Sequence, residues 1–169
     1  LTTRQSTSPA DGSNPTDSNS MFPQTPHKKL LVQSKIGVVT ISTASTTTYT
    51  VTVGSKSGGG NAFYIDGVER PSITINEGSS AIFNLSDNTV DSHPFYLSTT
   101  SDGSHGGGSV YTTGVTFKIN GSAVSQSAYA SGYASATTRA LEITVASSAP
   151  TLYYYCSSHS GMGNSINTP

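Results

Sequence analysis

From Tyr49 onward the sequence is a succession of short segments rich in β-branched and aromatic residues, each bounded by Gly, Pro, Asn or Asp. Two of the boundaries, Asp66-Gly67 and Asn120-Gly121, are dipeptides that favour tight hairpin turns. No long helical periodicity interrupts the pattern. About seven or eight short strands with such turn signals between them are typical of a sandwich, so we predict an all-β fold.

The expected strands are residues 49–53, 63–65, 72–75, 81–85, 94–98, 115–119, 141–145 and 151–155. Residues 123–136 are small and polar, and we expect a loop there that includes at most one helical turn. Residues 44–48 form a Ser/Thr hinge between this part of the chain and what precedes it.

Three regions are expected along the chain. Residues 1–29 form an extended arm, because prolines and polar side chains leave few apolar groups with which to build a core. This arm is either a disordered leader or a segment that orders by lying on a neighbouring subunit, as in β-strand addition. Residues 30–48 are a β-rich linker or first strand, which could also dock on a partner, and residues 49–169 form the sandwich.

Charge is sparse in this chain. Only 10% of the residues are charged and the net charge is −1, so no basic surface for nucleic acid is expected. No run of about 18 apolar residues occurs, which argues against a membrane span. The single cysteine cannot form an internal disulfide. The first residue is Leu1, from which we expect a processed or trimmed N-terminus.

The last expected strand runs into Cys156, followed at short intervals by His159 and Met162. Thiolate, imidazole and thioether are ligands that copper prefers, and His93 supplies a second imidazole just before an earlier strand. Strands 94–98 and 151–155 can be neighbours in a sandwich, which would place His93 beside Cys156. Gly161 gives the loop the backbone freedom for a tight turn.

Each of these residues has an alternative role. Cys156 could be a buried, inert side chain. Met162 could fill the end of the sandwich, and His93 could be a hydrogen-bonded histidine at a strand edge. His105, in a Gly/Ser-rich loop, and His27, in the arm, are expected to be solvated.

The stretch from about residue 49 to 162 resembles the cupredoxin family. The resemblance is carried by Asp91-Ser92-His93-Pro94-Phe95 and Tyr155-Cys156-Ser157-Ser158-His159-Ser160-Gly161-Met162. The spacing of the second motif is similar to that of amicyanins. The family implies a Greek-key β-sandwich and one mononuclear copper site, with His93, Cys156 and His159 in a trigonal plane and Met162 as a weak axial ligand.

Two features differ from small electron-transfer cupredoxins. The separation of His93 from Cys156 is longer, with Gly/Ser-rich loops inserted. Serines surround His159, where such proteins have an apolar docking patch; these are Ser157, Ser158 and Ser160.

A second resemblance covers nearly the same stretch. Residues 63–67, 93–103, 106–115 and 152–163 resemble modules in structural proteins of marine tailed phages and in secreted proteins of marine microbes. This resemblance implies a structural or adhesive role on a particle or filament.

We therefore expect a structural subunit of a virion or extracellular filament, located outside the cell or on the virion surface. Its arm would contact copies of itself or other structural proteins, and a copper site could remain as a stabilising clip. One alternative is a blue-copper electron-transfer protein. Another is a receptor- or glycan-binding module that uses the loop at residues 99–114. No enzymatic activity is expected, because no nucleophile elbow, phosphate loop or paired carboxylates stand out.

Overall fold

A computed structural model describes the backbone of residues 30–35 and 38–169, and the side chains from residue 44 onward. The predicted arm at residues 1–29 lies outside the described residues. None of the helices in the described part of the chain is both long and apolar enough to cross a membrane.

The strands are β1 (Leu30–Lys35), β2 (Val38–Thr43), β3 (Thr46–Ser55), β4 (Asn61–Ile65), β5 (Val68–Glu69), β6 (Ile73–Thr74), β7 (Ser80–Asn84), β8 (Phe95–Ser98), β9 (Val115–Ile119), β10 (Ser122–Val124), β11 (Arg139–Thr144), β12 (Leu152–Cys156) and β13 (Asn164–Asn167). The helical elements are α1 (Gln126–Gly132) and the 3₁₀ turns η1 (Asn88–Val90), η2 (Gly103–Gly106) and η3 (Tyr133–Ser135).

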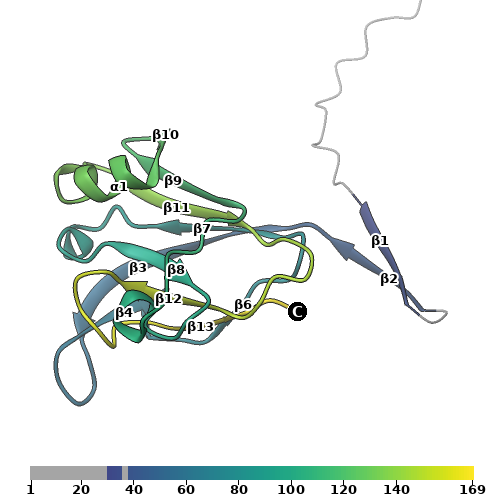
Figure 1. Ribbon diagram of the computed structural model, residues 1–169, viewed down its shortest axis with the longest axis horizontal. Helices are drawn as coiled ribbons and strands as arrows, with labels where there is room; N and C mark the ends of the chain where they lie inside the picture. The colour runs from purple at the N-terminus through teal and green to yellow at the C-terminus, as the bar shows by residue number, and fades with distance from the viewer. Residues whose placement is uncertain (1–29, 36–37) are drawn as a thin grey trace, which may run out of the picture.

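The body of the molecule is a sandwich of two mixed sheets (Figure 1). The larger sheet has the order β10-β9-β11-β7-β3-β4-β5, and the smaller one has the order β6-β13-β12-β8. Most pairs are antiparallel, whereas β3 with β7 and β6 with β13 are parallel. The prediction of an all-β sandwich is confirmed at this level.

Aromatic side chains join the two sheets. The Phe95 ring of the smaller sheet lies 5.1 Å from that of Phe63 and 4.9 Å from that of Phe83, both in the larger sheet. It also stacks on Tyr154, its neighbour in the smaller sheet. All four rings are fully buried. Burying large aromatic side chains contributes much of the stability of such a core. Phe95 also pairs in register with Cys156 and lies two residues after His93.

The segment before the sandwich forms a separate hairpin. β1 and β2 pair with each other in a two-stranded sheet of their own. Figure 1 shows this hairpin extending away from the sandwich. Residues 30–35 and 38–43 are thus strands, and they add to neither of the larger sheets.

Two local predictions were wrong. The expected hinge at residues 44–48 is mostly strand, because β3 begins at Thr46 and pairs with β7 over its first half. The expected loop at 123–136 contains α1 and η3. The Ser125 side chain caps α1 by accepting a hydrogen bond from the Ala128 N–H, and Tyr129 is fully buried against the sheet. Tertiary packing of one tyrosine thus stabilises a helix whose sequence is otherwise small and polar.

Candidate metal centre

His93 lies in the short connection between η1 and β8. Its N–H donates to the carbonyl of Val90 at 2.8 Å, which closes the turn, and Pro94 follows it. The His93 side chain is only 6% exposed. The turn itself is capped by Asp87, whose carboxylate accepts a hydrogen bond from the Thr89 N–H. The His93 side chain is therefore buried, and a hydrogen-bonded turn at the end of the sandwich holds it in place.

Cys156 is the last residue of β12 and pairs in register with Phe95 of β8. The Ser157 N–H then donates to the Pro94 carbonyl at 3.0 Å. The prediction that these two strands are neighbours, with His93 beside Cys156, is confirmed. The Cys156 side chain is fully buried.

The residues that follow Cys156 form the ligand loop, defined here as residues 156–162. The loop brings His159 back toward the cysteine, so that Nδ1 of His159 is 3.7 Å from the Cys156 Sγ. Nδ1 of His93 is 3.9 Å from the same sulfur. The donor atoms of all three residues lie within 4.8 Å of one another.

These distances can be tested against a bound metal ion. An ion about 2.3 Å from a thiolate sulfur and about 2.0 Å from an imidazole nitrogen separates the two donors by about 3.7 Å at a trigonal angle of about 120°. The two sulfur–nitrogen distances, 3.7 and 3.9 Å, agree with this value. The three residues therefore fit a single metal ion.

Met162 closes the ligand loop. Its side chain is fully buried, and its carbonyl accepts a hydrogen bond from the Phe63 N–H of β4 at 3.0 Å. Met162 and His159 line the same surface hollow of about 470 Å³, whose rim also includes Lys56, Asn61 and His105. Met162 thus lies beside the same hollow as the exposed His159.

Burial sets the protonation of the two enclosed donors. It raises the pKa of the Cys156 thiol, and hydrogen bonds from the N–H groups of Ser158 and His159 oppose this effect. Burial also lowers the pKa of His93, and the nearby His159 adds to the lowering. His93 is therefore neutral near pH 7 and offers a free lone pair, whereas Cys156 must lose its proton when a metal binds.

Polar residues from elsewhere in the chain support this site, and the sequence pattern did not reveal them. Asp91, two residues before His93, forms an ion pair of 2.6 Å with the buried Arg139. On the other side, Nε2 of His105 lies 3.0 Å from the Cys156 carbonyl oxygen, and the Gly161 N–H donates to Asp102 at 2.8 Å. His105 is exposed as predicted, yet it is tied to the ligand loop. The Asp-Gly dipeptide at 102–103 favours a turn, but nothing in the sequence indicates a contact with the ligand loop.

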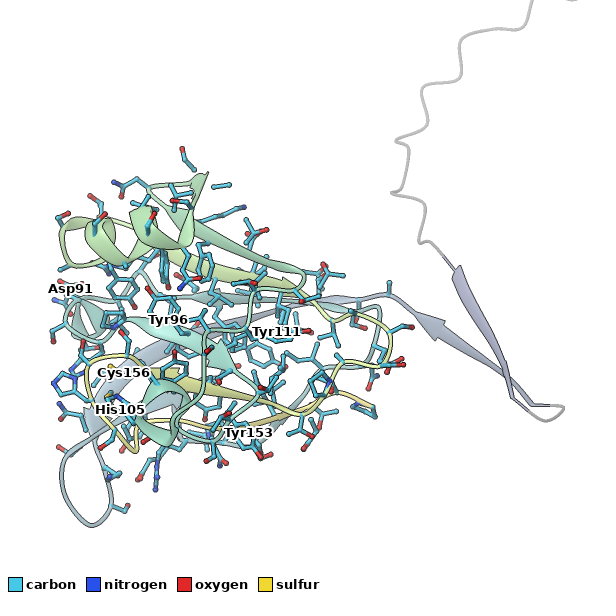
Figure 2. The ribbon with its side chains drawn as sticks, in the orientation of Figure 1. Asp91, Tyr96, His105, Tyr111, Tyr153 and Cys156 are labelled. Atoms are coloured by element: carbon cyan, nitrogen blue, oxygen red, sulfur yellow. The ribbon has the colours of Figure 1, made fainter. Side chains whose placement is uncertain are left out.

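Figure 2 shows the arrangement, with Asp91, His105 and Cys156 at the end of the sandwich that lies away from the β1–β2 hairpin. The fold and the site together define a β-sandwich protein with a candidate His/Cys/His metal centre at one end. No protein-family model, curated protein or solved structure matches this chain.

Proposed function

We propose that this chain is a cupredoxin-like module of a virion or extracellular filament, in which one copper ion acts as a structural clip. The observation that carries the proposal is the convergence of His93, Cys156 and His159 on one point, with Met162 closing the same loop. The metal would hold together two segments that are far apart in the sequence.

Copper is favoured by the chemistry of the donors. One thiolate and two imidazoles in a trigonal set, with a thioether nearby, form the ligand set of mononuclear copper–thiolate centres. A bound copper ion would supply redox chemistry and strong metal–ligand bonds at this position. Because the donors converge only in the folded chain, the binding free energy would add to the free energy of unfolding.

The surface around the site favours a clip over a docking site for an electron-transfer partner. The hollow beside His159 has a rim of polar residues, among them Lys56, Asn61 and Ser158. Among the side chains that the structure describes, Val68 on β5 is the only large apolar one that is well exposed. The serines expected around His159 are exposed, so the apolar patch that small electron carriers use has no counterpart in these residues.

The hairpin supports a role in assembly. β1 and β2 form a sheet separate from the sandwich, and Figure 1 shows them reaching away from it. Both edges of a two-stranded sheet offer backbone N–H and C=O groups to another chain. We propose that this hairpin, with the arm that precedes it, contacts neighbouring copies or other structural proteins.

The metal-binding part is tested by titrating copper(II) into the reduced full chain. We expect one equivalent to bind, an intense visible charge-transfer absorption from the copper–thiolate bond, and a higher unfolding temperature. Cys156→Ser is the matched control and should lose the absorption. A chain that takes up no copper, or a Ser variant with the same spectrum, would disprove the copper site.

The assembly part needs a separate test, because the clip could exist in a monomer. Analytical ultracentrifugation of the full chain should show self-association, or binding to other proteins of the same particle, that is lost when residues 1–43 are deleted. The deleted chain should keep its copper absorption. If both chains are monomeric and electron microscopy of the native particle shows no copy of the module, the assembly role is wrong.

Electron transfer is the second candidate, because His159 is exposed and offers a route from the metal to the surface. Electron self-exchange measured by NMR separates the two candidates. Fast exchange would favour the carrier, whereas slow exchange together with a large gain in unfolding temperature would favour the clip.

A further inference from the structure

The η2 loop, defined as residues 99–108, packs against β8 and β12 beside the ligand loop. It is closed by its own backbone hydrogen bonds, from Gly103 to Thr100 at 3.0 Å and from Gly108 to Gly103 at 2.8 Å. Gly103 lies so close to the Tyr155 ring that a Cβ there would be 2.3 Å from it. The loop is therefore a compact unit seated on the strand that ends in Cys156.

Two side chains of this loop reach the ligand loop at opposite ends. Nε2 of His105 lies 3.0 Å from the carbonyl oxygen of Cys156, the first residue of the ligand loop. The carboxylate of Asp102 accepts a hydrogen bond of 2.8 Å from the N–H of Gly161, the residue directly before Met162. The exposed residues 157–160, including His159, therefore lie between two contacts that the η2 loop makes, one at each end of the ligand loop.

The backbone at Asp102 strengthens the case for a specific role. Asp102 has φ of 59° and ψ of 16°, the left-handed conformation that glycine adopts most easily. A non-glycine residue there costs about 1 kcal/mol. Glycine would relieve that cost but would leave the Gly161 N–H without this acceptor. Position 102 therefore has an aspartate although its backbone conformation favours glycine.

We propose that Asp102 and His105 are positioning residues of the metal centre, which hold the two ends of the ligand loop in place before the metal binds. This inference rests on the proposed copper site and extends it to a loop outside the ligand set. Bonds that fix a ligand segment lower the entropy lost on binding. Loss of such supporting groups typically weakens metal binding about 10- to 100-fold.

The experiment compares variants of the full chain. Asp102→Ala removes the acceptor, and Asp102→Gly removes it while relieving the backbone strain. Asp102→Asn keeps an acceptor oxygen and loses only the charge. His105→Ala and His105→Gln form the matching pair, since glutamine can still donate to a carbonyl. Ser101→Ala is the control, because Ser101 is exposed in the same loop and, within the described residues, its side chain makes no hydrogen bond.

Two readouts are used. Amide hydrogen exchange of the metal-free chain reports whether Gly161 is protected, and the copper(II) affinity, visible spectrum and electron paramagnetic resonance report the centre itself. Asp102→Ala and Asp102→Gly should speed exchange at Gly161 at least about 10-fold and weaken copper binding about 10- to 100-fold. Asp102→Asn should restore both. His105→Ala should also weaken copper binding, and His105→Gln should restore it, whereas Ser101→Ala should match the wild type.

The proposal is overturned if Gly161 is unprotected in the wild type, or if the Ala and Gly variants match it in exchange, affinity and spectrum. It is also overturned if Asp102→Asn behaves as Asp102→Ala, because the charge rather than the hydrogen bond would then matter. A wild type that binds no copper would disprove the proposed copper site. The exchange measurement would still decide whether Asp102 holds the Gly161 end of the ligand loop.

Discussion

The two imidazoles of the candidate site are supported in different ways. His93 is buried on a turn whose neighbour, Asp91, pairs with an arginine that is only 3% exposed. His159 is exposed, on a loop held at its ends by two polar contacts from the η2 loop. The His93 half of the site, residues 87–93, is continuous with the hydrophobic core. The His159 half, residues 157–162, lies largely outside it.

The two halves should differ in how much a bound metal orders them. Buried, hydrogen-bonded groups keep their geometry without a ligand, whereas an exposed loop retains conformational freedom that binding removes. We therefore expect the His93 half to be formed in the metal-free chain. Between its two held ends, the exposed part of the ligand loop, residues 157–160, should gain order when the metal binds.

The largest effect is expected from Arg139, which anchors the His93 half. Its guanidinium donates to the carbonyls of Leu85 and Ala136 besides pairing with Asp91. Arg139→Met should lower the free energy of unfolding by about 2–6 kcal/mol, because these two carbonyls lose their donor at about 1–3 kcal/mol each. Urea unfolding measures this loss.

The control for that variant is Lys118→Met. Lys118 pairs with Glu142 at 2.7 Å, but both side chains are about a third exposed. Pairs of this kind contribute about 0–1 kcal/mol. If the Arg139 and Lys118 variants lose the same stability, the His93 half is not anchored by the buried arginine.

Copper should have the next largest effect. At about 100 times its dissociation constant, the metal adds about 2.7 kcal/mol to the free energy of unfolding. When copper(I) is bound, the backbone amides of Ser158, His159 and Ser160 should exchange their hydrogens more slowly than in the metal-free chain. The His93 amide, already bonded to Val90, should change little. Equal slowing in both halves would contradict the contrast between them.

Much of this architecture could be predicted from the sequence. Alternating β-formers and turn dipeptides located most strands of the sandwich, and Cys156, His159 and Met162 stood out because they share one short loop. Pairing of the strands that end near His93 and Cys156 followed from the sandwich prediction. These signals are local, or depend on one pairing of neighbouring strands.

The supporting groups could not be predicted in the same way. Arg139 and Asp91 are far apart in the sequence, and nothing local indicates that a charged residue at the start of β11 is buried beside η1. His105 sits in a Gly/Ser-rich loop that resembles a solvated segment, and only the packing of that loop on Tyr155 brings it to Cys156. Such contacts depend on how loops fold over the sandwich.

Gly103→Ala tests whether the η2 loop supports the His159 half of the site. A Cβ at Gly103, where φ is 53°, would overlap the Tyr155 ring, so the η2 loop must move. We expect a loss of about 1–3 kcal/mol in the free energy of unfolding, together with weaker copper binding. Gly107→Ala is the control, because φ there is 82° but no atom lies within 4 Å of the added Cβ. It should cost only the backbone strain, about 1 kcal/mol. Equal copper affinities in the two variants would show that the η2 loop does not support the ligand loop.

The smallest effect is expected at Asp87, which caps the turn leading to His93. Asp87→Ala should cost about 1 kcal/mol, the usual cost of losing an N-cap. Because Arg139 still holds the His93 half, the copper spectrum should stay unchanged, in contrast to Gly103→Ala. A changed spectrum would mean that the turn, rather than the ion pair between Asp91 and the buried Arg139, positions His93.

Asp87 should also make the stability of the His93 half depend on pH. Hydrogen bonds from the Thr89 hydroxyl and N–H lower the pKa of Asp87 below its ordinary value. Since the folded pKa lies below the unfolded one, the carboxylate stabilises the fold above about pH 3.9, and this contribution is lost as pH falls through the folded pKa. Asp87→Asn keeps the cap but cannot titrate, so its acid unfolding should begin less steeply than that of the wild type. Identical acid unfolding curves would show that the carboxylate is not held by Thr89, and the His93 half would then depend on Arg139 alone.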